Sequence, residues 1–357
     1  MPAQLLLQIF VIGPLGWLDW PPVHNARVTP ALAPTQFKLT IYPAPPSPLQ
    51  ALLLLPAAVF THTLVQSFIY MLANYNALTT QPHVVFIGGG NMTRAIVGGM
   101  LTDANVHSTS FKVSVVQRSE PNKQALLNDF AGLGLDVVTT VDQLSVPAHI
   151  AVWAVKPQVL KQVVLANQHV FGPDVLHVSV AAGVPSHALS AWLANPHVVR
   201  CMPNTPSTVG MGAAGLFACD AVTTQQRRQV ELILKATGLL VWVDSESQLE
   251  AVTAVSGSGP AYFFYFIQAM ADAGQAMGLP AHTALALAIA TARGAAELAT
   301  RSEETPAQLQ QRVTSTGGAT FEAIAVFNQA QLASTIAHAM AACSARATAM
   351  GNEFGKV

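Results

Sequence analysis

The stretch "HVVFIGGGNMTRAIVGGM", His83 to Met100, decides the fold of this chain of 357 residues. An apolar run is followed by Gly88 and Gly90, the first two glycines of the pattern G-x-G-x-x-G, and a helical pattern begins near Asn91. The first glycine permits a tight turn, the second lets backbone approach a pyrophosphate, and the helix start offers free N–H groups. The stretch therefore predicts a dinucleotide-binding strand–loop–helix unit, and its expected cofactor contacts are Gly88, Gly90, Asn91 and Met92.

The third position of this pattern departs from its usual residue. Thr93 stands there, whereas Gly or Ala normally lets the helix pack closely on the strand. The helix–strand contact must therefore accommodate a larger side chain.

The end of the second expected strand indicates which dinucleotide binds. It reads "VVQRSEPNK" (115–123), with no acidic residue at the position that bonds the ribose 2′-hydroxyl of NAD. Arg118, supported by the Ser119 hydroxyl, suits a 2′-phosphate. We expect NADPH as cofactor and weaker use of NADH, although Arg118 could instead be a solvated cation paired with Glu120.

Short β-rich runs alternate with helical patterns from residue 83 to about 243. The expected strands are 83–88, 112–117, 136–140, 149–155, 175–182 and 197–202, and 215–220 and 239–243 are expected at the edge. Strands without strict polar alternation, separated by helices, are typical of a parallel sheet covered on both faces. The fold class is therefore α/β, with a Rossmann-type doubly wound sheet over 81–244.

The pattern changes near residue 245, after which no convincing strand is found. Ala-rich helical runs dominate 245–357, for example 259–278, 282–300 and 331–350. A lone helical domain of this size with few charges buries its apolar surface poorly. We therefore expect an all-α C-terminal substrate and dimerisation domain that packs against a second copy.

Residues 1–80 form an apolar N-terminal extension with Asp19, Arg27 and Lys38 as its charged residues. Three interpretations stay open. The start of the chain could be misassigned, with the real one near Met71; the extension could be disordered or loosely packed; or the apolar run 51–72 could anchor it in a membrane.

Composition narrows the function classes. The formal net charge of −1 gives no indication of nucleic-acid binding or of an anionic membrane surface. The three cysteines lack metal-ligand or disulfide spacing, so we expect no metal site and a cytoplasmic protein with reduced thiols.

Five motifs, in order over about 81–345, resemble the pyrroline-5-carboxylate reductase family. They are "FIGGGNM" (86–92), "AVKPQ" (154–158), "MPNTP" (202–206), "SGSGPAY" (256–262) and "VTSTGGATFEAI" (313–324). The resemblance implies NADPH-dependent reduction of the cyclic imine 1-pyrroline-5-carboxylate to L-proline, the last step of proline biosynthesis. It also implies a homodimer, or a ring of dimers, formed through the helical domain.

The last motif suits the carboxylate of such a substrate. Gly317 and Gly318 predict a turn, and a helix starting near Ala319 offers free N–H groups beside two hydroxyls, so the segment can bind an anion without arginine. The resemblance implies that Thr320 also bonds the reacting nitrogen, which makes it the candidate catalytic residue. The expected substrate-binding residues are Ser315, Gly318, Ala319 and Thr320.

The remaining motifs predict the walls of the site. The strand before "AVKPQ" ends at the ligand-binding edge of the sheet, so Ala154, Val155, Lys156 and Pro157 are expected at the nicotinamide and ribose. "MPN" (202–204) is expected to wall the cleft. In "SGSGPAY", Ser258 is expected to cap a helix.

Two other functions compete with an imine reductase. A hydroxyacid dehydrogenase of the related two-domain group uses a helical lysine in its second domain, but residues 247–350 contain no lysine. A membrane-tethered or nucleotide-sensing regulator has support only in the apolar run 51–72.

Overall fold

The computed structural model describes residues 81–102 and 111–356. The N-terminal extension, including the run 51–72, lies outside the described residues. Among the described helices, none is both long and apolar enough to cross a membrane.

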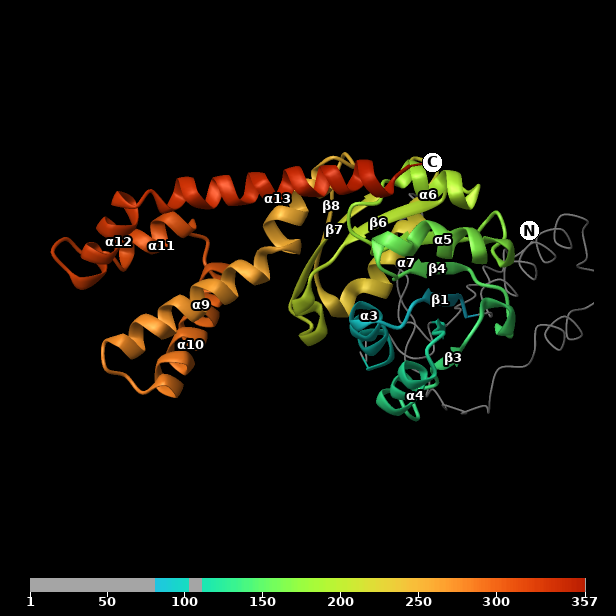
Figure 1. Cartoon of the computed structure of the whole chain (residues 1–357), viewed down its shortest axis with the longest axis horizontal. Helices are drawn as coiled ribbons and strands as arrows, with labels where there is room; N and C mark the ends of the chain where they lie inside the picture. The colour runs from blue at the N-terminus through green and yellow to red at the C-terminus, as the bar shows by residue number, and fades with distance from the viewer. Residues whose placement is uncertain (1–80, 103–110, 357) are drawn as a thin grey trace, which may run out of the picture. The chain divides into compact units, whose positions relative to one another are not determined.

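Eight strands form one sheet in the order β3-β2-β1-β4-β5-β6-β7-β8 (Figure 1). The first six are parallel in the Rossmann order; β7 is antiparallel to β6, and β8 is parallel to β7. The doubly wound prediction is confirmed. The strands are β1 His83–Ile87, β2 Lys112–Val116, β3 Asp136–Val138, β4 Ile150–Trp153, β5 Leu176–Ser179, β6 Val198–Met202, β7 Gly212–Ala218 and β8 Gly238–Trp242.

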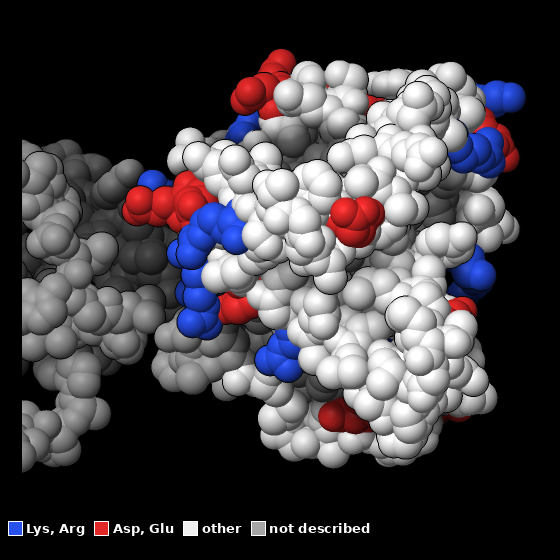
Figure 2. Space-filling model, turned by 90° about the vertical axis from the view of Figure 1, so that its left-hand side faces the viewer, with Lys and Arg blue, Asp and Glu red and all other residues white. Residues whose placement is uncertain are grey.

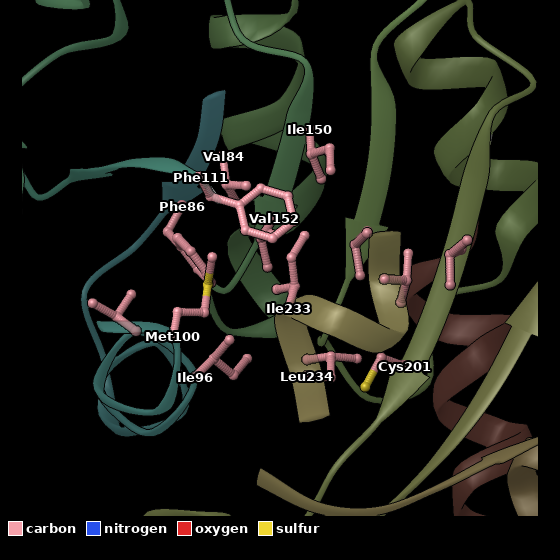
Figure 3. Close-up of a cluster of buried hydrophobic side chains, with 14 of the residues drawn as sticks. Val84, Phe86, Ile96, Met100, Phe111, Ile150, Val152, Cys201, Ile233 and Leu234 are labelled. Carbon is pink, nitrogen blue, oxygen red and sulfur yellow. The ribbon is translucent and has the colours of Figure 1, made fainter. Parts of the chain in front are cut away.

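Alternating side chains of β1 belong to two separate cores, one on each face of the sheet. Val84 and Phe86 pack with α3 (Asn91–Thr102), α4 (Glu120–Asp129) and α7 (Thr224–Leu234), as the cluster in Figure 3 shows for α3 and α7. Val85 and Ile87 pack with α5 (Pro157–Asn167) and α6 (Ser186–Leu193). Since both faces are covered, the strands carry apolar residues on both sides, which explains their continuous hydrophobic runs.

Helices alone make up the segment after the sheet, as expected. They are α8 Gln248–Val252, α9 Gly259–Ala276, α10 Ala281–Arg301, α11 Pro306–Arg312, α12 Ala319–Gln329 and α13 Leu332–Phe354. Helices α9 and α10 form the most extensive helix pair of the described chain, and small residues Gly274 and Ala284 meet between them. The C-terminal end of α13 returns to the sheet region, where Met350 packs on Gly183.

Ser258 does not cap a helix, so that expectation is wrong. A π-helical turn, η6 (Thr253–Gly257), joins α8 to α9 without leaving helical conformation. Ser258 itself has helical dihedral angles, its side chain makes no capping bond, and its Oγ accepts a hydrogen bond from the Cys343 thiol at 3.2 Å. The chain is thus helical before the motif begins, and a cap is not needed.

Short 3₁₀ turns complete the described elements. They are η2 Val141–Gln143, η3 Gln168–Val170, η4 Thr205–Val209 and η5 Lys235–Thr237.

Candidate functional site

An open pocket of about 500 Å³ lies at the carboxyl ends of β1, β2, β3 and β4. This is the edge where a doubly wound sheet binds its ligands. The pocket is lined by Ile87, Gly88, Gly89, Gly90, Val116, Gln117, Arg118, Thr139, Thr140, Ala154, Val155, Lys156, Val159, Gln162, Val163, Ala166 and Asn167.

Six of the ten residues expected at the cofactor line this pocket: Gly88, Gly90, Arg118, Ala154, Val155 and Lys156. The other four lie within two residues of lining residues, at the amino-terminal ends of helices α3, α4 and α5. They are Asn91, Met92, Ser119 and Pro157, none of which is itself a lining residue.

The glycine loop that follows β1 begins at Gly88, which has a φ of 104°. Its N–H donates to the Val116 carbonyl at 3.0 Å, and a β-carbon there would lie 2.7 Å from the Ala154 carbonyl oxygen. Only glycine fits this dihedral angle and this close approach. The loop backbone can therefore face the pocket directly.

Thr93, the unusual residue of the pattern, is fully buried. Its hydroxyl donates to the Gly88 carbonyl at 2.6 Å. The larger side chain is thus accommodated by a hydrogen bond that joins α3 to the loop.

Arg118 is exposed at the rim of the pocket. Glu120, its suspected partner, instead pairs with Lys123 at 3.9 Å, and Arg118 makes no ion pair within the described chain. Beside it, the Ser119 N–H donates to the Gln117 side chain at 3.1 Å, which orders the turn after β2. The guanidinium is therefore available to an anionic ligand.

Sequence reasoning missed the polar residues that complete the pocket. Thr139 and Thr140 directly follow β3, and Gln162 and Asn167 lie on α5. Polar residues at the end of a parallel strand are a signal that could have identified the two threonines. The α5 residues carry no comparable signal, because their approach depends on how that helix packs.

The turn before α12, where an anion site is expected, has the expected local structure. Gly317 has a φ of 74°, the Gly318 N–H donates to the Ser315 carbonyl at 2.9 Å, and α12 begins at Ala319. The side chains of Ser315 and Thr320 are exposed. The first N–H groups of α12 are therefore free to bind an anion.

The pocket and this turn do not meet within one chain. The pocket has no lining residue beyond Asn167, and α12 packs on α13. The expected substrate residues are thus brought together with one another but not with the expected cofactor residues.

Buried polar contacts hold the junction between sheet and helices. Glu246, just before α8, accepts hydrogen bonds from the Ser186 N–H and hydroxyl at 2.6 and 2.7 Å and from Arg200 at 2.7 Å. Burial alone raises the pKa of Glu246, but these donors outweigh it and hold the pKa below its usual range. The carboxylate stays charged and links β6, α6 and the start of the helices.

Asn204 supports the same junction from the "MPNTP" motif. Its side chain is buried, donates to the Ser256 carbonyl at 3.0 Å and accepts from the Ala213 N–H at 2.9 Å. Both ends of the amide are thus engaged in joining β7 to the π-helical turn. The residue holds the walls together, and its side chain does not face the pocket.

Comparison with known proteins decides the family. The chain is 40% identical over 276 residues to a pyrroline-5-carboxylate reductase of Pseudomonas aeruginosa, an alignment that covers 77% of this chain and 99% of that protein. This chain belongs to the pyrroline-5-carboxylate reductase family.

Further matches cover both parts of this family member. Residues 246–350 match the family model for pyrroline-5-carboxylate reductase dimerisation, and residues 83–183 match that for coenzyme F420-dependent NADP oxidoreductase. A Coxiella burnetii pyrroline-5-carboxylate reductase structure is similar with TM-score 0.70 and 36% identity, covering 78% of this chain and 100% of that chain. A Plasmodium falciparum pyrroline carboxylate reductase structure with NADP bound has TM-score 0.64 and 25% identity, covering 76% and 98%.

Proposed function

We propose that this chain reduces the cyclic imine 1-pyrroline-5-carboxylate to L-proline with NADPH, the last step of proline biosynthesis. The observation that carries the proposal is the pairing, in one member of this family, of a dinucleotide pocket with a separate anion-binding turn. The bound nicotinamide supplies the hydride for the C=N carbon. The protein's task is to hold the two reactants in the correct orientation.

The residues of the pocket suit the successive groups of NADPH: its pyrophosphate, its 2′-phosphate and its nicotinamide with the attached ribose. The Gly88–Gly90 backbone is proposed to hold the pyrophosphate, with Asn91 and Met92 at the start of α3 beside it. At one end, Arg118 and the Ser119 hydroxyl hold the 2′-phosphate, which favours NADPH over NADH. At the other end, Ala154, Val155, Lys156 and Pro157 surround the nicotinamide and its ribose.

The turn before α12 suits the carboxylate of the imine. The Ser315 hydroxyl and the amides of Ala319 and Thr320 would bind the carboxylate, and Gly318 leaves the approach open. The Thr320 hydroxyl is proposed to hydrogen-bond the ring nitrogen, which carries a proton when the imine is reduced. No acid–base dyad is required by this arrangement.

A second copy of the chain is proposed to complete the site. Because the turn and the pocket are separate in one chain, the turn of one protomer would face the pocket of its partner. Most of the described face in Figure 2 is uncharged, with Lys, Arg, Asp and Glu side chains scattered over it. Helix α9 also leaves Phe263, Phe264 and Tyr265 exposed, which supports burial against another copy. Assembly is proposed to be a homodimer or a ring of dimers.

The proposal also covers the domain organisation and the cellular location of the chain. We assign 1–80 to an N-terminal extension, 81–244 to the NADP-binding domain and 245–357 to the helical substrate and dimerisation domain. Cytoplasmic location agrees with the three unpaired cysteines, Cys201, Cys219 and Cys343. Burial raises the pKa of the Cys201 thiol to about 12, so this thiol is inert.

An assay of the full chain tests the proposal. With 1-pyrroline-5-carboxylate present, NADPH should be oxidised and L-proline should appear in equal amount, while a 2-oxo acid with NADPH should give background rates. Proline formation that does not exceed the enzyme-free control would refute the proposed reaction.

A further inference from the structure

The hydroxyl of Thr93 joins helix α3 to the phosphate-binding loop. It donates to the Gly88 carbonyl at 2.6 Å, and the Thr93 side chain has 0% of its surface exposed. We infer that Thr93 is a positioning residue for the cofactor: its hydroxyl fixes the peptide between Gly88 and Gly89, and so presents the loop amides to the pyrophosphate. The inference rests on the proposed use of this pocket for NADPH.

Contacts other than the Thr93 hydrogen bond also hold the loop in place. The Gly88 N–H is bonded to Val116 of β2, and Gly88 lies so close to Ala154 and Val155 beyond β4 that a β-carbon would come within 2.7 and 2.9 Å of them. The carbonyl of Gly88 is the group that can still turn. Thr93 binds this carbonyl, and therefore removes the remaining freedom at the first glycine.

Fixing that carbonyl also sets the direction of the next N–H. A peptide group is planar and trans, so its C=O and N–H point in opposite directions. While the Gly88 carbonyl faces Thr93, the Gly89 N–H must point to the other side of the loop. Since Gly88, Gly89 and Gly90 all line the pocket, a rotated peptide would change the donors that meet the pyrophosphate.

Burial makes the hydroxyl hard to replace. With no exposed surface at Thr93, solvent does not reach the position from outside, and a buried carbonyl without a donor is unfavourable. Valine has the shape of threonine but would place a methyl group against the carbonyl. Alanine would remove the donor and leave space, whereas serine would keep the donor.

The chain offers a matched control in Thr237 of η5. Its hydroxyl donates to the Leu234 carbonyl, also at 2.6 Å, and the residue is 3% exposed. Element η5 packs against α3, but Thr237 does not line the pocket. Thr237→Val therefore removes a bond of the same kind, length and burial without touching the loop.

The experiment measures NADPH affinity directly, by fluorescence titration of the full chain without substrate. Thr93→Val should raise the NADPH Kd roughly tenfold, and Thr93→Ser should bind like the wild type. With NADPH at saturation, the KM for the imine should not change in Thr93→Val, because the loop is proposed to contact the cofactor and not the imine. Thr237→Val should lower the Tm yet retain the wild-type Kd.

Several outcomes would overturn the proposed role of the Thr93 hydroxyl. Equal Kd values for Thr93→Val and wild type, or a loss in Thr93→Ser as large as in Thr93→Val, would overturn the role of the hydroxyl. An equal loss of affinity in Thr237→Val would overturn it too, because general loosening would then explain the effect. If Thr93→Val does not fold, Thr93→Ala gives the same comparison. A wild-type chain that fails to bind NADPH would overturn the proposed function itself.

Discussion

The sheet region and the helical segment differ in how completely one chain buries its apolar side chains. In the sheet, Phe86 and Trp153 are fully buried, whereas on α9 the side chains of Phe263, Phe264 and Tyr265 are 63%, 64% and 75% exposed. Helices α11 and α12 contain no buried residue at all. The proposed cofactor pocket is therefore built by a single chain, while the proposed substrate turn belongs to a segment that a single chain leaves uncovered.

The proposed reaction requires both a bound cofactor and a bound substrate, and the two regions are expected to meet these requirements in different ways. Large exposed apolar patches on a soluble protein mark interaction sites, so the helical segment is expected to be stable only against a partner. The sheet region has a core on each face and is therefore expected to bind its cofactor without such a partner. Four experiments test this division.

The largest effect is expected from breaking the proposed partner contact on α9. Phe264→Glu would place a carboxylate in an apolar interface, where burial of an unpaired charge is strongly unfavourable. We expect monomers by light scattering and loss of turnover, with the NADPH Kd unchanged. Gln124→Glu, at an exposed position of α4, adds the same charge and should leave both assembly and activity intact. An assembly that persists in Phe264→Glu would show that this face is not the interface.

Reversing the charge at the pocket rim should have the next largest effect. Arg118→Glu replaces a cation at the proposed 2′-phosphate site with a repelling anion, so the NADPH Kd should rise roughly 100-fold. The NADH Kd should change little, because NADH lacks that phosphate. Lys112→Glu reverses a charge at the opposite end of β2 and serves as the control. Equal losses for both cofactors would mean that Arg118 does not recognise the 2′-phosphate.

Removing one hydroxyl from the substrate turn should have a smaller effect. Thr320→Ala should lower kcat/KM for the imine about tenfold, the value of one hydrogen bond in the transition state. NADPH affinity should be retained, since Thr320 is proposed to contact the imine and not the cofactor. Thr320→Ser keeps the hydroxyl and should restore most of the rate. Wild-type kinetics in Thr320→Ala would exclude the residue from the site.

The smallest effect concerns pH and the buried sheet. Burial, with a lesser contribution from His197, lowers the pKa of His177 to about 4 from 6.5. As pH falls, the unfolded state therefore takes up the proton first, so the contribution of His177 to stability is full above pH 6.5 and is lost between 6.5 and 4. At pH 5.5 the loss should be about 1 kcal/mol.

His177→Asn isolates this titration. The ring Nδ1 of His177 accepts a hydrogen bond from the Trp153 indole at 3.2 Å, and an asparagine oxygen can accept it instead. Urea unfolding at pH 7 and pH 5.5 should show a smaller decline for the variant than for the wild type. Identical declines would mean that His177 is not held neutral by the core.

Most of the fold could be predicted because its signals are local. Adjacent residues predict the Gly88–Gly90 loop, the start of α3 and the alternation of apolar runs with helical patterns. The expected strand 112–117 agrees with β2 to within one residue. The turn at Gly317 is likewise specified by adjacent residues. The antiparallel direction of β7 could not be predicted, because pairing depends on contacts between distant strands.

The parts that escaped prediction depend on long-range contacts. Asn204 donates to a carbonyl 52 residues away in the π-helical turn. Because that turn is already helical, the chain enters α9 without a cap at Ser258. The Thr93 hydroxyl and the α5 side chains of the pocket were missed for a related reason. The sequence gives the type of each of these residues, but it does not show which distant residues they contact in the folded chain.

Helix α13 fixes the distance between α12 and the sheet region. Its 23 residues span about 35 Å, from the contact with α12 to the sheet region, where Lys161 Nζ donates to the Lys356 carbonyl at 2.7 Å. A straight helix changes length only in steps of whole residues, so it cannot stretch to let the turn reach the pocket of its own chain. If a partner completes the site as proposed, the same spacing would set, to within a helical turn, where that partner must sit.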